Sequence, residues 1–432
     1  MRQIAIVVAC MCLAGCRSAA PERPKPTRES APAPPTPRRA TPTPAVLRPP
    51  IGGIAPLPTA LALAGNEGRD SYGYPTQYVD KAGLRSLLLH KRYADLTRNL
   101  ETFQARFEAD NSYEYWPTDA ADAFGSSEPQ LLPFLNEWVI ASPDSFAPYL
   151  ARGTYWQNVA RTSRGVKWAP DTSEEELAGM RDAHGLSRKD LARSLQLRPK
   201  LMAAQWVQMA TLYGEAEDAR RRTLDAALAS CPRCYLIRAA YMSTLVPRWG
   251  GSYEAMAAFA RESEQVPNPK MRLLKGYVDQ DQANMLHISR RYAEALVAIE
   301  RACALGDHPR FLKQRGQAYR RLNQLDKAMQ DFDRALELHP PDSDMILQRA
   351  KIHSLAQRWE PAARDLVAGL RIDPSSEFGL TTRGIVLPPL LNEATQAQQA
   401  GRRGDAVRLI ELAAQLAPEN ADVQARRAAL GK

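Results

Sequence analysis

Two cysteines separated by two other residues have a spacing at which thiol side chains do chemistry. They stand in the run Cys231-Pro232-Arg233-Cys234. A redox role for such a pair requires a strand-helix-strand context, and a structural zinc site requires four ligands. The surrounding sequence offers neither. We interpret the pair as a structural disulfide, with free thiols, a metal site and catalysis as the alternatives.

The sequence offers one candidate pair for acid–base catalysis, Glu114 and Asp119. Glycosidases use such a pair of carboxyl groups to hydrolyse glycans. The sequence does not fix the distance between them. The six histidines show no metal-binding spacing, and no nucleophile-elbow, phosphate-binding or dinucleotide-binding motif is present in the sequence. We therefore expect no enzymatic activity, no metal and no cofactor.

The 15 Tyr and 7 Trp residues lie mostly between Tyr72 and Tyr253. Two groups, Tyr113 to Trp116 and Trp168 with the acidic run 174–176, are expected in insertions rather than on helical stripes. Rigid amphipathic rings suit protein interfaces and sugar stacking. One hypothesis is a glycan-binding module or hydrolase in residues 80–265. The other is that large side chains fill the seams between helices.

The positive charge of the chain is concentrated at its start. The formal net charge is +9, and residues 1–60 contain eight Arg or Lys and two Glu, a net of +6. Residues 61–432 therefore have a net charge of 9 − 6 = +3. This balance argues against nucleic acid as a partner of the folded part.

The first 16 residues have the order of an export signal. A basic start at Arg2 is followed by the apolar run 4–13 and by Leu13-Ala14-Gly15-Cys16. This ending resembles the lipobox of bacterial lipoproteins. The resemblance implies cleavage after Gly15, lipid on Cys16 and a membrane anchor. Arg17 in place of an Asp favours the outer membrane, with the protein facing the periplasm. Export would also place Cys231 and Cys234 in oxidising surroundings.

Residues 17–60 contain 13 Pro and few large apolar side chains. Such a segment cannot bury enough surface to offset its ordering entropy. We expect a disordered, polyproline-like tether over 16–60. Its positive charge suits either a solvated spacer or contact with anionic lipid or cell-wall polymer.

Small and aromatic residues recur with a 34-residue period. In the unit Pro309–Asp342 they are Gly316, Tyr319, Ala328, Phe332, Ala335 and Pro340. In the unit that starts at Ser343 they are Ala350, His353, Ala362, Leu366, Gly369 and Pro374. The pattern resembles the tetratricopeptide repeat (TPR). Small residues allow two antiparallel helices to cross closely, and Pro ends the second helix.

Weaker copies extend in both directions. One unit precedes residue 309 and another follows a ten-residue insertion, before a capping helix at 420–431. Upstream, Arg152-Gly153 repeats the spacing of Arg315-Gly316, with its partner helix displaced by an insertion at about 164–186. Tyr93 is expected to open a second helix that runs to Glu108. The runs 145–153 and 247–256 resemble a bacterial domain family of unknown function that accompanies TPR units.

No strand-like alternation of any length is present, so we predict an all-α chain, a TPR-like α-solenoid of antiparallel helix pairs. The predicted regions are a signal peptide (1–15), a lipidated tether (16–60), a helical domain with degenerate repeats (61–268) and a TPR array with its capping helix (269–432).

The resemblance to TPR proteins implies a concave face, formed by the first helices, that binds peptides. Its positions map to Arg310, Lys313, Gln317, Arg320, Arg321 and Lys351. This basic stripe predicts an acidic peptide or a carboxylate terminus as partner, and ordinary solvated charge is the alternative. We expect a non-catalytic scaffold that recruits a partner protein in envelope, secretion or pilus assembly. The glycan-binding or hydrolytic role is the alternative function, and a simple spacer between envelope layers is a third.

Overall fold

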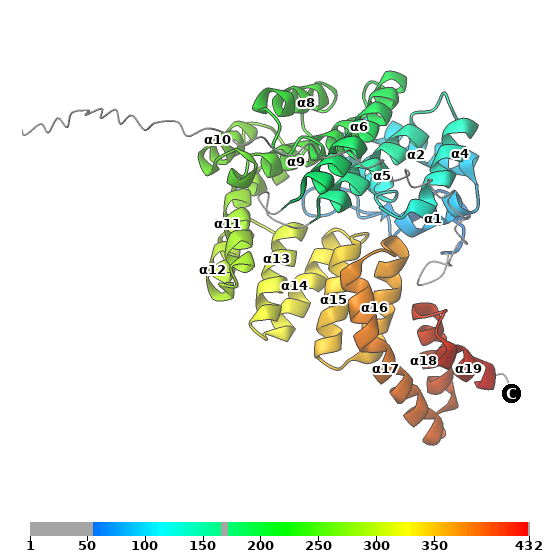
Figure 1. Ribbon diagram of the computed structural model, residues 1–432. Coiled ribbons are helices and arrows are strands. Elements are labelled where there is room, and N and C mark those ends of the chain that lie inside the picture. Colours follow the sequence, from blue (N-terminus) through cyan, green and yellow to red (C-terminus); the bar gives the residue numbers. More distant parts are fainter. Residues whose placement is uncertain (1–54, 166–171, 431–432) are drawn as a thin grey trace, which may run out of the picture. The chain divides into compact units, whose positions relative to one another are not determined.

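The computed structural model describes residues 55–165 and 172–430. The predicted signal peptide, Cys16, most of the tether and Trp168 lie outside these residues. The prediction of an all-α solenoid is confirmed (Figure 1). The sole sheet in the described residues is one antiparallel pair of two-residue strands, β1 (Leu63–Ala64) and β2 (Tyr78–Val79), in which Leu63 pairs with Val79.

The α-helices follow one another along the chain with short connections. They are α1 (Lys81–Leu89), α2 (Tyr93–Ala109), α3 (Tyr115–Asp122), α4 (Leu132–Ala141), α5 (Ala147–Arg164), α6 (Glu174–Leu197), α7 (Met202–Ala210), α8 (Glu217–Ser230), α9 (Leu236–Thr244), α10 (Tyr253–Ser263), α11 (Gly276–Ile288), α12 (Tyr292–Cys303), α13 (Pro309–Arg321), α14 (Leu325–Leu338), α15 (Ser343–Leu355), α16 (Trp359–Ile372), α17 (Glu377–Gln399), α18 (Arg403–Leu416) and α19 (Ala421–Leu430). The short 3₁₀ helices are η1 (Asn111–Tyr113), η2 (Pro129–Leu131), η4 (Pro247–Trp249) and η5 (Pro269–Lys275).

The turn inside a helix pair has the same backbone form at five places. Lys91, Arg290, Asn323, Gln357 and Gly401 each follow a first helix with φ between 55° and 72°. This left-handed conformation ends a helix because the following N–H groups bond back to its last carbonyls. In α13–α14, for example, the N–H of Gln324 donates to the carbonyl of Tyr319 at 2.9 Å. The recurrence shows that α1–α2 is built like the four later pairs.

The predicted repeats are confirmed as helix pairs. The unit at 309 forms α13–α14, its neighbours form α11–α12 and α15–α16, and the cap forms α19. The ten-residue insertion does not make a loop. It lengthens α17 to 23 residues, with Pro388 and Pro389 inside the helix.

An arginine–aspartate pair marks equivalent positions of three units. Arg315 donates from Nε and from a terminal guanidinium nitrogen to Asp331 at 2.9 and 2.6 Å, and Arg349 does the same to Asp365 at 2.8 Å for both bonds. In the upstream pair, Arg152 binds Asp190 at 2.8 and 2.7 Å. The predicted equivalence of the Arg152 and Arg315 units is therefore confirmed, and α5 and α6 absorb part of the insertion between them as longer helices.

The expectation that these aromatic and acidic groups lie off the helices is wrong for Tyr115, Trp116 and the run 174–176. Tyr115 and Trp116 open α3, and Trp116 is buried against Phe103 and Tyr113. The run 174–176 forms the first turn of α6, because Ser173 and Glu176 make a capping box.

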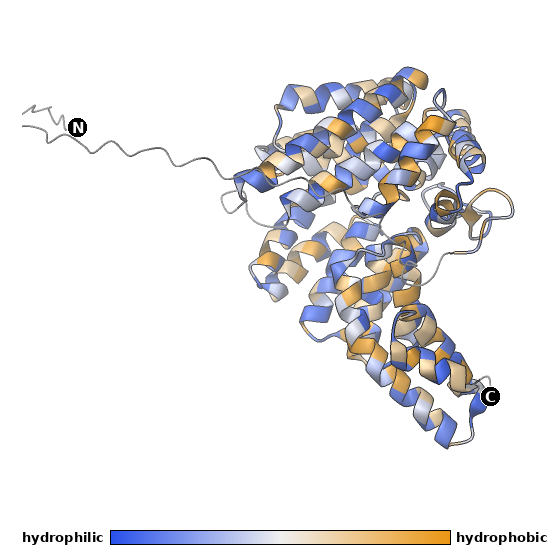
Figure 2. Ribbon diagram, turned by 45° about the vertical axis from the view of Figure 1, so that its right-hand side comes forward, coloured by the Kyte–Doolittle hydropathy of each residue, from blue (hydrophilic) through white to orange (hydrophobic). Residues whose placement is uncertain are grey.

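Figure 2 shows apolar residues along one side of many helices and polar residues along the other. The buried side chains form a core that is continuous across the predicted boundary between residues 268 and 269. One cluster joins Phe259 of α10 to Met271 of η5 and Tyr277 of α11. Before residue 61, the chain already contacts α1, where the Ser86 hydroxyl donates to the carbonyl of Ala55 at 2.6 Å.

The two helices of a pair approach most closely at a small residue. A Cβ atom added to Gly316 of α13 would lie 2.8 Å from Cε2 of Phe332, which is fully buried in α14. Gly185 of α6 has no heavy atom within 4 Å of the same position. The two glycines thus allow helix propensity and close packing to be separated.

We predict that Gly316→Ala lowers the free energy of unfolding by roughly 1–3 kcal/mol, because overpacking outweighs the better helix propensity of alanine. The control Gly185→Ala should raise it by about 0.5–1 kcal/mol. Chemical denaturation of both variants measures this. A stabilised Gly316→Ala variant would contradict the close approach of α13 and α14.

Candidate functional site

The odd-numbered helices from α1 to α15 line one groove, because each presents its inner face to the same side. The groove consists of two adjoining cavities. The aromatic cavity, of about 390 Å³, is walled by Tyr115, Trp206, Tyr213, Tyr235 and Tyr277. The polar cavity, of about 310 Å³, is lined by Arg248, Asp281, Asn284, Gln314 and Gln317 among others. Tyr213, Ser243, Tyr277, Arg310 and Lys313 line both.

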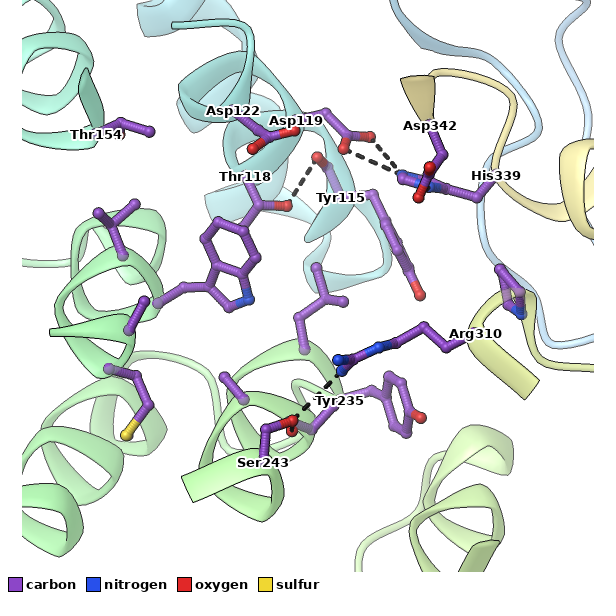
Figure 3. A pocket seen from close by; sticks show the side chains of 18 of the residues that line it. Tyr115, Thr118, Asp119, Asp122, Thr154, Tyr235, Ser243, Arg310, His339 and Asp342 are labelled. Carbon is purple, nitrogen blue, oxygen red and sulfur yellow. Dashed lines mark hydrogen bonds and ion pairs between the residues drawn. The ribbon is translucent and has the colours of Figure 1, made fainter. Parts of the chain in front are cut away.

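One end of the aromatic cavity is closed by charged contacts between distant parts of the chain. Asp119 of α3 lies 3.1 Å from Nε2 of His339, which follows α14 (Figure 3). Asp119 also lies 3.3 Å from Nζ of Lys81. Lys81 also pairs with Asp122 at 2.8 Å. Burial raises the pKa of Asp119, but Lys81 and His339 outweigh burial and the net shift is downward. The carboxylate is therefore charged and already neutralised.

Arg310 of α13 extends into the aromatic cavity (Figure 3). Its guanidinium donates to the Ser243 hydroxyl at 3.3 Å and lies 5.7 Å from the centre of the Tyr277 ring. Within residues 55–165 and 172–430, no carboxylate forms an ion pair with it. Arg310 is thus a solvent-exposed cation without a carboxylate partner in these residues, in a concave, partly aromatic setting.

Lys313, one turn further along α13, is in a different electrostatic state. Its Nζ lies 3.0 Å from Asp344. Burial lowers the pKa of Lys313, but Asp344 and Asp342 outweigh burial and the net shift is upward. Gln317 lines the polar cavity. The structure therefore brings Arg310, Lys313 and Gln317 of the predicted stripe to one groove. The charge of Lys313 is already neutralised by Asp344.

The other three predicted residues do not line the groove. Arg320 and Arg321 end α13, and Lys351 lies on α15, and together they form what we term the outer cation cluster. Burial and the neighbouring Arg320 lower the pKa of Lys351, and burial and Arg321 lower that of Arg320. The side chain of Arg321 lies over Tyr292, 5.8 Å from the ring centre.

The outer cation cluster lacks negative charge. Across the described residues, no Asp or Glu forms an ion pair with any of its three members, and Nε of Arg320 is buried without a hydrogen-bond partner. Like charges that lower one another's pKa raise the energy of the unbound state, which an anion can relieve.

Reasoning from the sequence missed the aromatic wall of the groove, although its own mapping could have found part of it. In the preceding unit Ala283 is equivalent to Gly316. The positions of Arg310, Lys313 and Gln317 then correspond to Tyr277, Gln280 and Asn284, and all three line the groove. Trp206 and Tyr235 come from the degenerate units, where the repeat pattern is too weak to assign positions.

Glu114 and Asp119 do not act together. The Glu114 carboxylate accepts hydrogen bonds from the Tyr74 hydroxyl at 2.7 Å and from the backbone N–H groups of Tyr235 and Leu236 at 3.0 and 2.9 Å. It caps the start of α9, away from the groove lining. Because each carboxylate is fully engaged by separate partners, the arrangement does not provide the acid and base of a glycosidase.

Cys231 and Cys234 lie between α8 and α9, with their Sγ atoms at 1.99 Å as a disulfide. Both are buried, so the pair belongs to the core rather than to the groove. Cys303 is a free thiol whose pKa burial raises to about 11. The described segments contain no group of three or more metal-ligating side chains, and none of their helices combines the length and apolarity needed to cross a membrane.

Comparison with protein families supports the resemblance to the tetratricopeptide repeat and the resemblance to a domain family of unknown function. Residues 80–217 and 210–264 match a domain of unknown function (DUF4034), and residues 309–342 match the tetratricopeptide repeat. No curated protein matches the chain.

Several solved structures resemble the chain. The TPR domain of P58(IPK) is 15% identical over 77% of this chain and 76% of that one, with a TM-score of 0.25. Pseudomonas aeruginosa pilF is 17% identical over 58% and 91%, with a TM-score of 0.23. A chain of the Cut9-Hcn1 hetero-tetramer is 13% identical over 81% and 55%, with a TM-score of 0.28.

His308 gives the groove wall a pH dependence. The ring is buried beside Tyr235, with Nε2 3.0 Å from its hydroxyl. Burial above all, and then the charges of Arg310 and Lys270, lower its pKa well below 6.5. The unfolded chain therefore binds a proton near pH 6.5 that the folded protein does not bind.

We predict that the free energy of unfolding falls as the pH drops below 6.5, with His308 contributing at most about 1.4 kcal/mol per pH unit. His184, His287 and His353 also have lowered pKa values and add to this slope. Urea denaturation from pH 7.5 to 5 should give a smaller slope for His308→Gln than for the unmodified chain. Equal slopes would show that His308 is not buried in its neutral form.

Proposed function

We propose that this protein is a lipid-anchored scaffold of the bacterial envelope that faces the periplasm and binds an acidic segment of a partner protein. The TPR-repeat fold is of a kind that commonly binds partner proteins. The outer cation cluster supports an acidic partner, because it lies on two successive first helices, α13 and α15, and lacks carboxylate partners in the described residues.

The groove beside the cluster suits an extended segment. Gln317 lies one turn before Arg321 on α13 and offers an amide that can pair with a peptide backbone. Lys313 should contribute little to an acidic ligand, since Asp344 already holds its Nζ at 3.0 Å. We therefore place the acidic residues of the partner at Arg320, Arg321 and Lys351. A role in secretion, pilus or outer-membrane assembly is compatible with such a scaffold.

We predict that Arg320→Glu with Lys351→Glu weakens binding of a labelled decapeptide of alternating Glu and Ala by roughly tenfold, since two attractive charges become repulsive. Fluorescence anisotropy at low salt measures the affinity, and the Gln–Ala analogue should bind weakly to every variant.

The matched control is Arg261→Glu with Lys327→Glu. These exposed residues lie on the second helices α10 and α14, and their reversal changes the net charge by the same amount. If the control weakens the peptide as much as the cluster variant does, the attraction is a property of net charge and the proposed site is wrong.

The membrane anchor rests on the run Leu13-Ala14-Gly15-Cys16 and the apolar segment before it. We predict that Cys16→Ser moves the protein from the membrane fraction to the soluble fraction, because no thioether can form on serine. Fractionation of cells that express each form, with mass spectrometry of the N-terminal peptide, tests this. A Cys16→Ser protein that still sediments with membranes would remove the lipid anchor from the proposal.

A further inference from the structure

We propose that the aromatic cavity is a binding site for a small organic carboxylate that carries a planar ring. It adjoins the proposed peptide site but rests on other residues, since the peptide is placed at the outer cation cluster and at Gln317 of the polar cavity. The volume of about 390 Å³ lies in the range of small-molecule sites. The walls combine the rings of Tyr115, Trp206, Tyr213, Tyr235 and Tyr277 with a few polar groups.

Lys81, Lys313 and Arg310 are the Lys and Arg side chains that line the cavity, and they differ in whether a carboxylate pairs with them. Lys81 is paired with Asp119 and Asp122, and Lys313 is paired with Asp344. Arg310 has the Ser243 hydroxyl and the Tyr277 ring as neighbours, and within the described part of the chain no carboxylate meets its charge. A guanidinium presents two parallel N–H donors that match the two oxygens of a carboxylate.

The N-termini of the helices around the cavity differ in the same way, in whether a carboxylate caps them. The first turn of α9 is capped by Glu114, and that of α15 by Asp342, whose carboxylate accepts from the N–H of Met345 at 2.9 Å. The first turn of α13 follows His308, whose side chain makes no capping hydrogen bond. Because Pro309 and Arg310 line the cavity, the positive end of α13 adds to the guanidinium charge there.

The aromatic side chains that line the cavity indicate which group the ligand carries besides its carboxylate. Tyr235 and Tyr277 stand beside Arg310, and Trp206 and Tyr115 line the same space (Figure 3 labels Tyr115 and Tyr235). Flat rings pack favourably against such side chains in offset or edge-to-face arrangements. A planar group attached to a carboxylate therefore satisfies both parts of the cavity at once.

The test compares 2-naphthoate with its neutral amide, 2-naphthamide, by isothermal titration calorimetry on the full-length chain. We expect the acid to bind the unmodified protein at least tenfold more tightly than the amide. In Arg310→Gln this preference should fall to about twofold or less, while Arg310→Lys, which keeps the charge but not the fork of donors, should lie between. Equal binding of acid and amide to the unmodified protein would overturn the proposal without any variant.

The matched control is Arg321→Gln, on the same helix but outside the cavity. It should leave naphthoate binding unchanged and weaken the Glu–Ala decapeptide, whereas Arg310→Gln should do the reverse. Loss of naphthoate binding in both variants, or displacement of naphthoate by the decapeptide, would show that one site takes both ligands and would refute a separate cavity site. Failure of the peptide experiment alone leaves the acid–amide comparison unaffected.

Discussion

The close approach of two antiparallel helices is the constraint on which the rest of this structure depends. At Gly316 the partner ring of Phe332 occupies the space that a side chain would need. Such a pair is too small to bury its apolar faces alone, so each pair packs against the next. The left-handed turn after the first helix, at Asn323 and its four equivalents, fixes the direction in which the second helix returns.

Stacking of the helix pairs explains why the candidate binding residues lie on the inner side of the array. Successive first helices lie next to one another there, so residues dozens of positions apart line one groove. Asp119, Lys81 and His339 meet at one end of this groove, where Lys81 forms ion pairs with Asp119 and Asp122. Arg310 and the outer cation cluster differ from Lys81, because no carboxylate in the described residues pairs with them.

Much of the fold could be predicted from residue types because the residues that define a repeat act within a single helix pair. Gly316, Ala328 and Pro340 each act within one helix pair, so their spacing predicted the pairs and the cap. The candidate site was predicted less completely. All six residues of the predicted stripe lie on the first helices α13 and α15. Spacing alone could not separate Lys313, which Asp344 neutralises, from Arg310 and Arg320, which no carboxylate in the described residues pairs with. Partners of charged side chains come from other units, and a single-unit pattern contains no information about them.

The sequence by itself determined the repeat architecture, the near-neutral balance of residues 61–432 and the hypothesis of a lipid on Cys16, since each depends on local spacing or composition. The tertiary structure alone decided that Glu114 caps α9 instead of facing Asp119, and that five aromatic rings from distant segments enclose one cavity. The physical reason is that capping, ion pairing and cavity formation depend on which helices become neighbours. That outcome follows from the packing of all the pairs together.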